Sequence, residues 1–223
     1  MDRLKSLTED QHRPNAASPF PSSEPSKADY NSSMPENKRI ILAITGASGA
    51  IYGVKALETL KALGVEVHLI ITPVAAGVIS HETGLSIEAV HQMADKSYQP
   101  TDLHAPIASG SFKTDGMLVI PCSIKTLSGV ANCYGANLVQ RAADVCLKEG
   151  RPLLLAVRET PLHLGHLRLM EIAAQAGAII FPPIPAFYNK PQSITDLVNA
   201  TVGRMLARFG IENQLYQPWD GEN

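Results

Sequence analysis

Short apolar runs alternate along most of the chain with segments in which apolar residues recur at helical spacing. The apolar runs predict buried strands over residues 40–44, 65–71, 117–120, 153–157 and 178–181. The periodic segments predict helices over 50–63, around 74–80 and 86–94, over 162–175 and over 194–209. A further helical signal begins after residue 126 and ends at residue 149. Near-continuous apolar strands that alternate with helices indicate a parallel sheet covered on both faces. We therefore expect an α/β fold, a three-layer αβα sandwich.

Residues 1–38 depart from this pattern, because they are rich in Pro, Ser, Asn and charge and have almost no periodic apolar positions. Such a segment cannot offset the entropy of ordering, so we expect a disordered N-terminal tail. A mitochondrial presequence is the alternative, but presequences are poor in acids, and Glu9 and Asp10 interrupt this one. A cytoplasmic location is therefore favoured. Residues 39–210 are expected to form the one domain, and 211–223 a C-terminal tail.

Composition narrows the class of protein. Hydrophobic residues make up 45% of the chain and charged residues 18%, which suffices to bury a sizeable core. The net charge of −2 gives no sign of the excess of basic residues that nucleic-acid-binding or membrane-binding proteins show. No apolar run reaches the roughly eighteen residues of a membrane helix. Three cysteines without a C-x-x-C pair argue against a zinc site or a disulfide framework. The composition therefore leaves one class of protein, a soluble enzyme or binding domain that works in a reducing compartment.

Candidate chemistry lies where the predicted strands end, because ligands of open parallel sheets bind beyond the carboxyl ends of the strands. The first such segment, Gly46-Ala47-Ser48-Gly49, opens a helix. Its glycines let backbone N–H groups approach an anion, and a helix N-terminus favours a phosphate. The pattern G-x-G-x-x-G is absent, so one phosphate, as in a mononucleotide, suits the turn better than a pyrophosphate. The alternative is a tight turn in which Ser48 caps the helix.

Two further polar segments follow predicted strands. Ser123, Lys125 and Thr126 offer a second cluster of donors, with a capped helix start as the equal alternative. Arg158 and Glu159 form a charged pair at the carboxyl end of the strand predicted over 153–157. An ion pair there is better placed to contact a ligand than to act as a solvated surface pair, so we interpret it as functional.

Two cations on one predicted helix give a weaker signal. Arg141 and Lys148 lie seven residues apart, hence on one helix face, and together could clamp a second phosphate. The alternative, and the commoner use of such residues, is surface pairing with Asp144 and Glu149.

Metal and thiol chemistry find little support. His163 and His166 lie three residues apart without an obvious third ligand, so no metal is expected. No histidine lies at a partnering position for Cys122, so we interpret this residue as a small buried side chain and not as a nucleophile.

Five motifs together carry a family resemblance. They are T-G-A-S-G-A-I-Y-G-V, P-C-S-I-K-T-L-S-G, R-A-A-D-V-x-L-K-E, R-E-T-P-L-H-L-G-H-L-R-L-M and P-P-x-P-A-F-Y-x-x-P-Q-S, spread over about residues 38–209. The chain resembles the flavin prenyltransferase family, the UbiX type formerly named phenylacrylic acid or 3-octaprenyl-4-hydroxybenzoate decarboxylases. The resemblance implies a Rossmann-like or flavodoxin-like fold assembled as a homododecamer.

The resemblance also implies an activity. Family members join a dimethylallyl group from dimethylallyl phosphate to N5 and C6 of reduced FMN, and the prenylated FMN is the cofactor of UbiD-type decarboxylases. This chemistry needs a leaving phosphate held by cations and a dry, electron-rich flavin face, and it demands no metal.

The family's site residues carry over position by position. The resemblance assigns FMN contacts to Gly46, Ala47, Ser48, Thr72, Ser123, Ile124, Lys125, Thr126 and Arg158. It assigns prenyl-phosphate contacts to Tyr188, Arg204, Arg141 and Lys148. Catalytic roles in proton handling and carbocation stabilisation fall to Glu159, Glu82 and Ser48. One departure is Pro73, which replaces a basic residue common in the family.

Two other functions stay open. Flavoprotein cysteine decarboxylases share the fold but rely on a histidine base after the first helix, where this chain has a predicted strand that contains His68. A non-catalytic subunit that delivers FMN to a partner could dispense with the four prenyl-phosphate residues, and all four are present.

Overall fold

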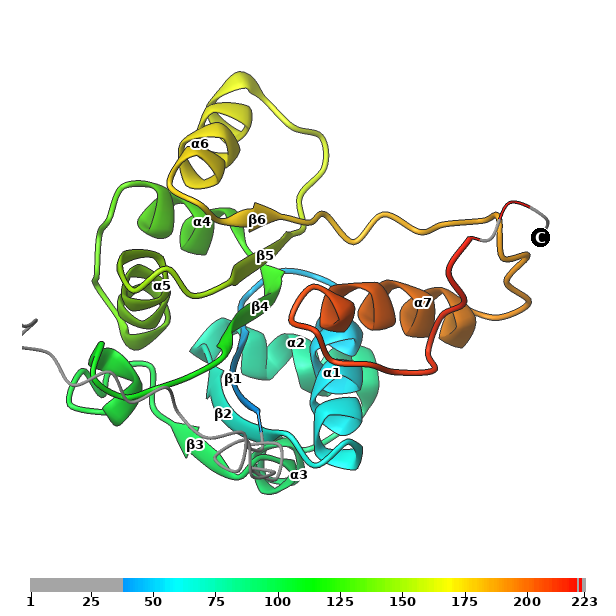
Figure 1. The fold of residues 1–223 in the computed structure, drawn as a ribbon, viewed down its shortest axis with the longest axis horizontal. Coiled ribbons are helices and arrows are strands. Elements are labelled where there is room, and N and C mark those ends of the chain that lie inside the picture. The colour runs from blue at the N-terminus through cyan, green and yellow to red at the C-terminus, as the bar shows by residue number, and fades with distance from the viewer. Residues whose placement is uncertain (1–37, 220, 222–223) are drawn as a thin grey trace, which may run out of the picture. The chain divides into compact units, whose positions relative to one another are not determined.

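The computed structural model describes residues 38–219 and 221, so the tail expected over 1–38 lies almost wholly outside the described residues. The described chain forms a six-stranded parallel sheet in the order β3-β2-β1-β4-β5-β6 (Figure 1). Its strands are β1 (Arg39–Ile44), β2 (Glu66–Ile71), β3 (Lys96–Tyr98), β4 (Gly116–Cys122), β5 (Leu153–Val157) and β6 (Ile179–Ile180). The helices are α1 (Ala50–Ala62), α2 (Pro73–Thr83), α3 (Ile87–Met93), α4 (Ile124–Ala131), α5 (Leu138–Lys148), α6 (Leu164–Gln175) and α7 (Ile194–Ala207), with one 3₁₀ turn, η1 (Pro106–Ala108).

Alternate residues of the central strand feed two separate hydrophobic cores. Ile40, Leu42 and Ile44 of β1 pack with residues of α1, α2, α3 and α7 on one face of the sheet. Ile41 and Ala43 pack with residues of α4, α5 and α6 on the other face. All five side chains are at most 1% exposed, which explains why the strand is a continuous apolar run in the sequence. The predicted three-layer α/β sandwich is confirmed, and its strand order is the Rossmann one.

Three parts of the chain differ from the sequence expectation. Residues 96–111, for which the apolar pattern predicts no helix or strand, contain β3 and η1; the edge strand lacks an apolar run because its side chains are exposed or half-buried. The helical signal that ends near residue 149 divides into α4 and α5, and Asn137 caps α5 by accepting the N–H of Gln140. The last strand is only two residues long, and residues 181–193 then run irregularly to α7.

The chain beyond the expected domain end at residue 210 packs back onto the domain. We call residues 211–219 the C-terminal strap. Ile211 is 5% exposed and lies in the core that α1 and α7 share, and Leu215 packs against the same core. Figure 1 shows the strap, in red, running alongside α7. In its described part, the segment expected as a tail is therefore packed structure.

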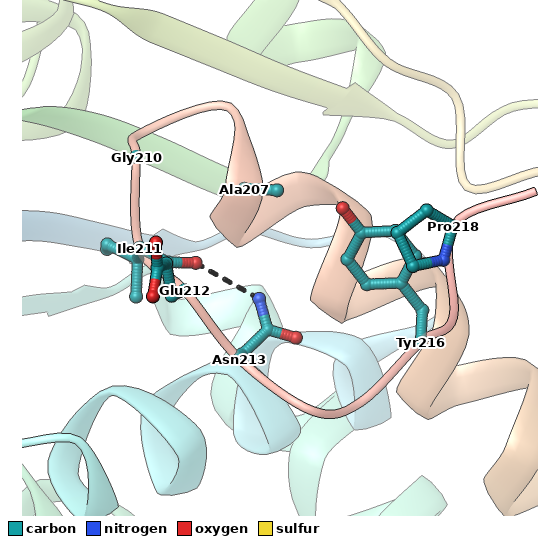
Figure 2. Close-up of a pocket in the computed structure, with 7 residues that line it drawn as sticks. All are labelled: Ala207, Gly210, Ile211, Glu212, Asn213, Tyr216 and Pro218. Carbon is teal, nitrogen blue, oxygen red and sulfur yellow. Dashed lines mark hydrogen bonds between the residues drawn. The ribbon is translucent and has the colours of Figure 1, made fainter. Parts of the chain in front are cut away.

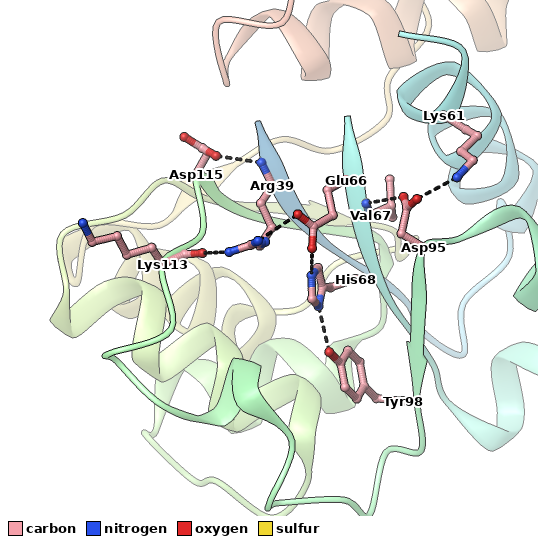
Figure 3. A network of polar contacts seen from close by, with 9 residues as sticks. All are labelled: Arg39, Lys61, Glu66, Val67, His68, Asp95, Tyr98, Lys113 and Asp115. Carbon is pink, nitrogen blue, oxygen red and sulfur yellow. Dashed lines mark hydrogen bonds and ion pairs between the residues drawn. The ribbon is translucent and has the colours of Figure 1, made fainter. Parts of the chain in front are cut away.

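A polar network lies at the amino ends of β1 and β2 (Figure 3). Arg39 forms an ion pair with Glu66 at 2.8 Å, and the buried imidazole of His68 lies 2.9 Å from Glu66 Oε1 and 2.8 Å from the Tyr98 hydroxyl. The hydrogen bond from Arg39 is the main effect that lowers the pKa of Glu66, against the opposing effect of burial. Ligands of such a sheet bind at the carboxyl ends of its strands, whereas this network lies at their amino ends. His68 therefore links β2 to β3 and is not placed as a catalytic base.

Candidate functional site

A buried hydroxyl joins the two loops at the point where the strand order reverses. β1 lies between β2 and β4, so the chain leaves β1 toward one side of the sheet and later returns on the other. Thr45, directly after β1 and 1% exposed, donates its hydroxyl to the Pro121 carbonyl at 2.8 Å. The same oxygen accepts the backbone N–H of Ser123 at 2.8 Å. Thr45 therefore fixes the loop after β1 against the loop after β4, at the position where ligands of doubly wound sheets bind.

Close packing shapes the Gly46–Gly49 loop. A Cβ atom on Gly46 would lie 2.6 Å from Val74 Cγ1 in the first turn of α2, so only glycine lets the two segments approach this closely. Gly49 has a φ of 98° and is the N-cap of α1, without a side-chain capping bond. The alternative in which Ser48 caps the helix is therefore wrong; Ser48 is exposed beside it.

The N-terminus of α1 is closed instead by an acid from α2. Glu82 accepts the N–H of Gly49 at 3.1 Å and 3.0 Å through its two oxygens, and that of Ala50 at 2.8 Å. A carboxylate suits this position because a helix N-terminus carries partial positive charge. A phosphate at this loop must therefore use other donors than these two N–H groups.

Other donors are available at the same edge. The backbone N–H groups of Gly46 and Ser48 have no hydrogen-bond acceptor within the described residues. Thr72, the N-cap of α2, makes no side-chain capping bond, and its buried Oγ1 has no partner in the described part of the chain. The Thr72 N–H donates to the Ile44 carbonyl at 3.1 Å, which places this hydroxyl beside the start of the loop. Such unpartnered donors fit the phosphate of FMN.

The segment after β4 is a capped helix start. Ser123 Oγ accepts the Thr126 N–H at 3.3 Å and lies 3.1 Å from the Thr126 hydroxyl, so the N-cap interpretation is confirmed. Capping leaves the next two N–H groups, those of Ile124 and Lys125, without an acceptor in residues 38–219. The Lys125 side chain is exposed. The segment therefore retains donors for a ligand as well as its structural role.

Arg158 projects from the end of the neighbouring strand. Its N–H donates to the Cys122 carbonyl at 3.0 Å, which extends the pairing of β4 and β5, and its side chain is exposed. Burial raises the pKa of Tyr52, in the first turn of α1, and the positive charge of Arg158 opposes that rise. The guanidinium therefore lies within electrostatic reach of Tyr52, next to the loop after β1. Sequence reasoning overlooked both Thr45 and Tyr52, although both stand in the T-G-A-S-G-A-I-Y motif.

Glu159 is not paired with its neighbour. In the described part of the chain it forms no ion pair with Arg158, so that expectation is wrong; its Oε1 accepts the N–H of Thr160 at 3.0 Å. It does not cap α6 either, because His163 is the N-cap and accepts the Gly165 N–H. An exposed carboxylate thus stands at the carboxyl end of β5 without a strong partner.

Two residues expected to bind the prenyl phosphate come together from distant segments. Tyr188 and Arg204 line one small cavity with Phe181, and the Arg204 guanidinium lies 5.8 Å from the Phe181 ring centre. The Tyr188 ring packs edge-on against Trp219 of the strap, with ring centres 5.8 Å apart. The cavity is lined by residues that follow β6 and by residues of α7.

The other two cations are engaged elsewhere in the single chain. Arg141 donates to the Ala108 carbonyl and pairs with Asp144 at 2.9 Å, and Lys148 lies 3.7 Å from Glu149. Lys148 ends α5 just before β5 begins, which places it at the amino edge of the sheet. Within one chain the two residues are therefore not gathered with Tyr188 and Arg204.

Thiol and metal chemistry stay unsupported. Complete burial raises the pKa of the Cys122 thiol to about 12, so it is no nucleophile near neutral pH. The rings of His163 and His166 lie 3.6 Å apart, and the described residues hold no cluster of three metal-ligating side chains. No helix among them is both long and apolar enough to cross a bilayer.

Comparisons with known proteins agree with this geometry. The flavoprotein family model matches residues 29–206. The flavin prenyltransferase UbiX of Escherichia coli K12 is 52% identical over 187 residues, which cover 82% of this chain and 99% of that protein.

Solved structures resemble the fold closely. The crystal structure of AnUbiX (PadA1) in complex with FMN and dimethylallyl pyrophosphate has a TM-score of 0.83 at 45% identity, covering 84% of this chain and 100% of that one. The dodecameric FMN-dependent UbiX-like decarboxylase of Escherichia coli O157:H7 has a TM-score of 0.80 at 46% identity, covering 82% and 100%. The FMN-dependent cysteine decarboxylase TvaF, at 18% identity and a TM-score of 0.52 over 64% of this chain and 88% of that one, shares the fold alone.

Proposed function

The chain belongs to the flavoprotein family and, within it, to the UbiX-type flavin prenyltransferases, and we propose that it joins a dimethylallyl group from dimethylallyl phosphate to N5 and C6 of reduced FMN. The observation that carries the proposal is the pairing of two features. Unpartnered donors gather at the strand-order reversal, and a cavity lined by Tyr188 and Arg204 lies beyond the end of β6. The unpartnered donors suit a mononucleotide, and the guanidinium and phenol hydroxyl that line the cavity suit the phosphate group of an ester.

FMN would be held by the loops after β1, β2, β4 and β5. The backbone N–H groups of Gly46 and Ser48 and the Thr72 hydroxyl suit its phosphate, because these donors lack partners in the described chain. The Ser123–Thr126 segment and Arg158 offer further donors along the same edge. Bound reduced FMN supplies an electron-rich ring as the acceptor of the dimethylallyl carbon atoms.

Tyr188 and Arg204 would hold the phosphate of the prenyl donor. Breaking its allylic C–O bond sends an electron pair to the phosphate oxygen, and a guanidinium stabilises the charge that accumulates there. Arg141 and Lys148 would join this group from a second copy of the chain, because neither lines the cavity of its own chain. A homo-oligomer, for which the dodecameric relative is the precedent, would provide such a copy.

Three residues would handle the proton that leaves the flavin ring as the second bond closes. Glu159 is the strongest candidate, because its exposed carboxylate lies at the end of β5 beside Arg158 and is free of an ion pair in the described residues. Ser48 lies next to the α1 cap, and Glu82 holds that cap. A carboxylate near the allyl group would both stabilise its positive charge and accept the proton.

The product would serve a UbiD-type decarboxylase as its prenylated cofactor. The cysteine-decarboxylase alternative loses weight because His68, buried between Glu66 and Tyr98, is occupied at the opposite edge of the sheet. The delivery-subunit alternative predicts FMN binding without turnover.

Anaerobic incubation decides between the three functions. The full chain, reduced FMN and dimethylallyl phosphate are combined, and mass spectrometry of the flavin is expected to show one added dimethylallyl unit. A parallel arm uses dimethylallyl pyrophosphate, and another offers a cysteine-terminated peptide together with oxidised FMN, which accepts the two electrons that this decarboxylation releases. An unmodified flavin in both prenyl arms would overturn the proposal, and carbon dioxide release in the cysteine arm would favour the decarboxylase alternative.

A further inference from the structure

One amide side chain fixes the C-terminal strap to the middle of α7. Asn213 Nδ2 donates to the Gly203 carbonyl at 3.0 Å and to the Ile211 carbonyl at 3.1 Å, and its Oδ1 accepts the Leu215 N–H at 3.2 Å. Figure 2 shows this side chain at the centre of the turn that the strap makes after Gly210. One residue thus shapes the strap and binds it to the helix.

Gly203 is the counterpart of this contact on the helix. A Cβ atom there would lie 2.7 Å from Asn213 Oδ1, 2.8 Å from Tyr216 Cδ1 and 2.9 Å from Leu215 Cβ. Glycine inside a helix costs about 1 kcal/mol relative to alanine, so its presence needs a reason. The reason here is the close approach of the strap, which no larger residue permits.

The strap contacts Tyr188, which lines the donor cavity, and Gly203, which precedes the cavity residue Arg204 in α7. Arg204 follows Gly203 directly and lines the cavity from α7, where its guanidinium lies 5.8 Å from the Phe181 ring centre. Tyr188 lines it from the irregular segment 181–193 and packs against Trp219 at the end of the strap. In Figure 1 the strap runs from the C-terminal end of α7 back to the far end of that segment.

We propose that the C-terminal strap, through the contact between Asn213 and Gly203, positions Arg204 and Tyr188 for the prenyl donor. The inference rests on the proposed function, in which these two residues bind the donor phosphate. Asn213 acts here as a positioning residue, because it contacts the helix and not the donor. The FMN donors lie on other loops, so loss of the strap contact is expected to affect the prenyl donor and leave FMN binding unchanged.

Two variants and one control test the proposal in the full-length, FMN-loaded protein. Asn213→Ala removes the contact from the strap side, and Gly203→Ala displaces the strap while it improves the helix propensity of α7. Gly77→Ala is the matched control, since Gly77 is also inside a helix but a Cβ atom there meets nothing within 4 Å. Both test variants are expected to raise the KM for dimethylallyl phosphate about 10-fold, equal to about 1.4 kcal/mol. The Kd of FMN and the KM of the control stay within about two-fold of wild type, which is the scatter of a surface substitution.

The possible results distinguish a role of the strap in binding the prenyl donor from a purely structural role, and they test this role separately from the proposed reaction. A fall in Tm with an unchanged KM in both test variants would show that the strap only stabilises the fold, and this would overturn the inference. Wild-type protein that binds FMN but forms no product defeats the proposed function; calorimetric titration of dimethylallyl phosphate into the same FMN-loaded proteins then tests the strap without turnover. Equal donor affinity in wild type and variants, or no donor binding at all, would overturn the inference in that measurement.

Discussion

The carboxylate of Glu82 accepts the backbone N–H of Gly49 at 3.0 Å and 3.1 Å, so a side chain from α2 closes the N-terminus of α1. The contact joins residues 33 positions apart, and it replaces the cap that the loop itself lacks. One consequence concerns the proposed FMN site, whose phosphate must bind the loop beside this carboxylate through Gly46, Ser48 and Thr72. A second concerns stability, because Glu82 serves the fold as well as any role in proton handling.

Glu82→Ala is expected to lower the free energy of unfolding by about 1–2 kcal/mol, since it leaves two helix-terminal N–H groups without their acceptor. Glu82→Gln keeps one acceptor oxygen and is expected to lose less. Urea titration of both variants measures this difference. If Glu82 also handles a proton, turnover falls in the Gln variant despite its near-normal stability; normal turnover in that variant would restrict Glu82 to its structural role.

Thr72→Val is expected to weaken FMN binding about 10-fold without destabilising the fold, because the hydroxyl has no partner in the described chain and a hydrogen bond to a charged phosphate is worth about 1.5 kcal/mol. Fluorescence titration of FMN measures the affinity. Thr59→Val is the control, since that hydroxyl donates to the Lys55 carbonyl within α1, away from the site. Equal FMN affinity of wild type and Thr72→Val would remove Thr72 from the flavin site.

Arg158→Ala and Arg204→Ala are expected to separate the two proposed pockets. Arg158 directly follows β5 beside the FMN loops, so its loss is expected to raise the Kd of FMN about 10-fold or more, as for a charged hydrogen bond. Arg204 lines the donor cavity, so its loss spares FMN and raises the KM for dimethylallyl phosphate. Equilibrium dialysis with FMN and steady-state kinetics distinguish the two. FMN release by Arg204→Ala would show that the pockets are wrongly assigned.

Glu159→Gln is expected to bind FMN and donor normally but to slow product formation about 10²-fold, a typical loss for one acid–base group. The neutral amide neither stabilises a cation nor accepts a proton at neutral pH. Single-turnover mass spectrometry of the flavin measures the rate. Because the carboxylate of Glu159 accepts only the adjacent Thr160 N–H among residues 38–219, Tm is expected to stay close to wild type. Unchanged turnover would end the catalytic assignment.

Stability is expected to fall in acid through the network around Glu66. Its folded-state pKa is lowered, chiefly by the hydrogen bond from Arg39, so the ionised form is the one that the fold favours. The contribution is therefore present above the unfolded-state pKa near 4.5 and is lost as the pH drops through the lower folded-state value. Urea midpoints measured from pH 7 to pH 3 test this. Glu66→Gln is expected to be less stable at pH 7 and to show a shallower acid decline; a parallel decline in both proteins would contradict the assignment.

Much of the fold follows from local pattern. The burial of both faces of the sheet makes β1, β4 and β5 near-continuous apolar runs, and β2 departs from such a run only at Glu66 and His68 of the polar network. The half-exposed edge strand β3 lacks such a run, and its assignment depends on pairing with β2. Helix ends at Gly64 and Gly150, both with positive φ, follow the same local logic.

The candidate site likewise combines features that depend on neighbours along the chain with features that depend on tertiary packing. The segments that end strands and carry donors can be read from the sequence, because strand ends and N-caps such as Ser123 depend on neighbours along the chain. Three contacts depend on the packing of distant segments: Thr45 joins two loops, Glu82 occupies the end of α1, and Arg141 donates to the Ala108 carbonyl. The tertiary structure also decided that the strap lies on Gly203, which makes a helical glycine necessary. Most of these contacts join residues from about ten to nearly eighty positions apart. Packing of the sheet and helices brings such residues together, and the periodicity of apolar residues along the chain does not predict which of them meet.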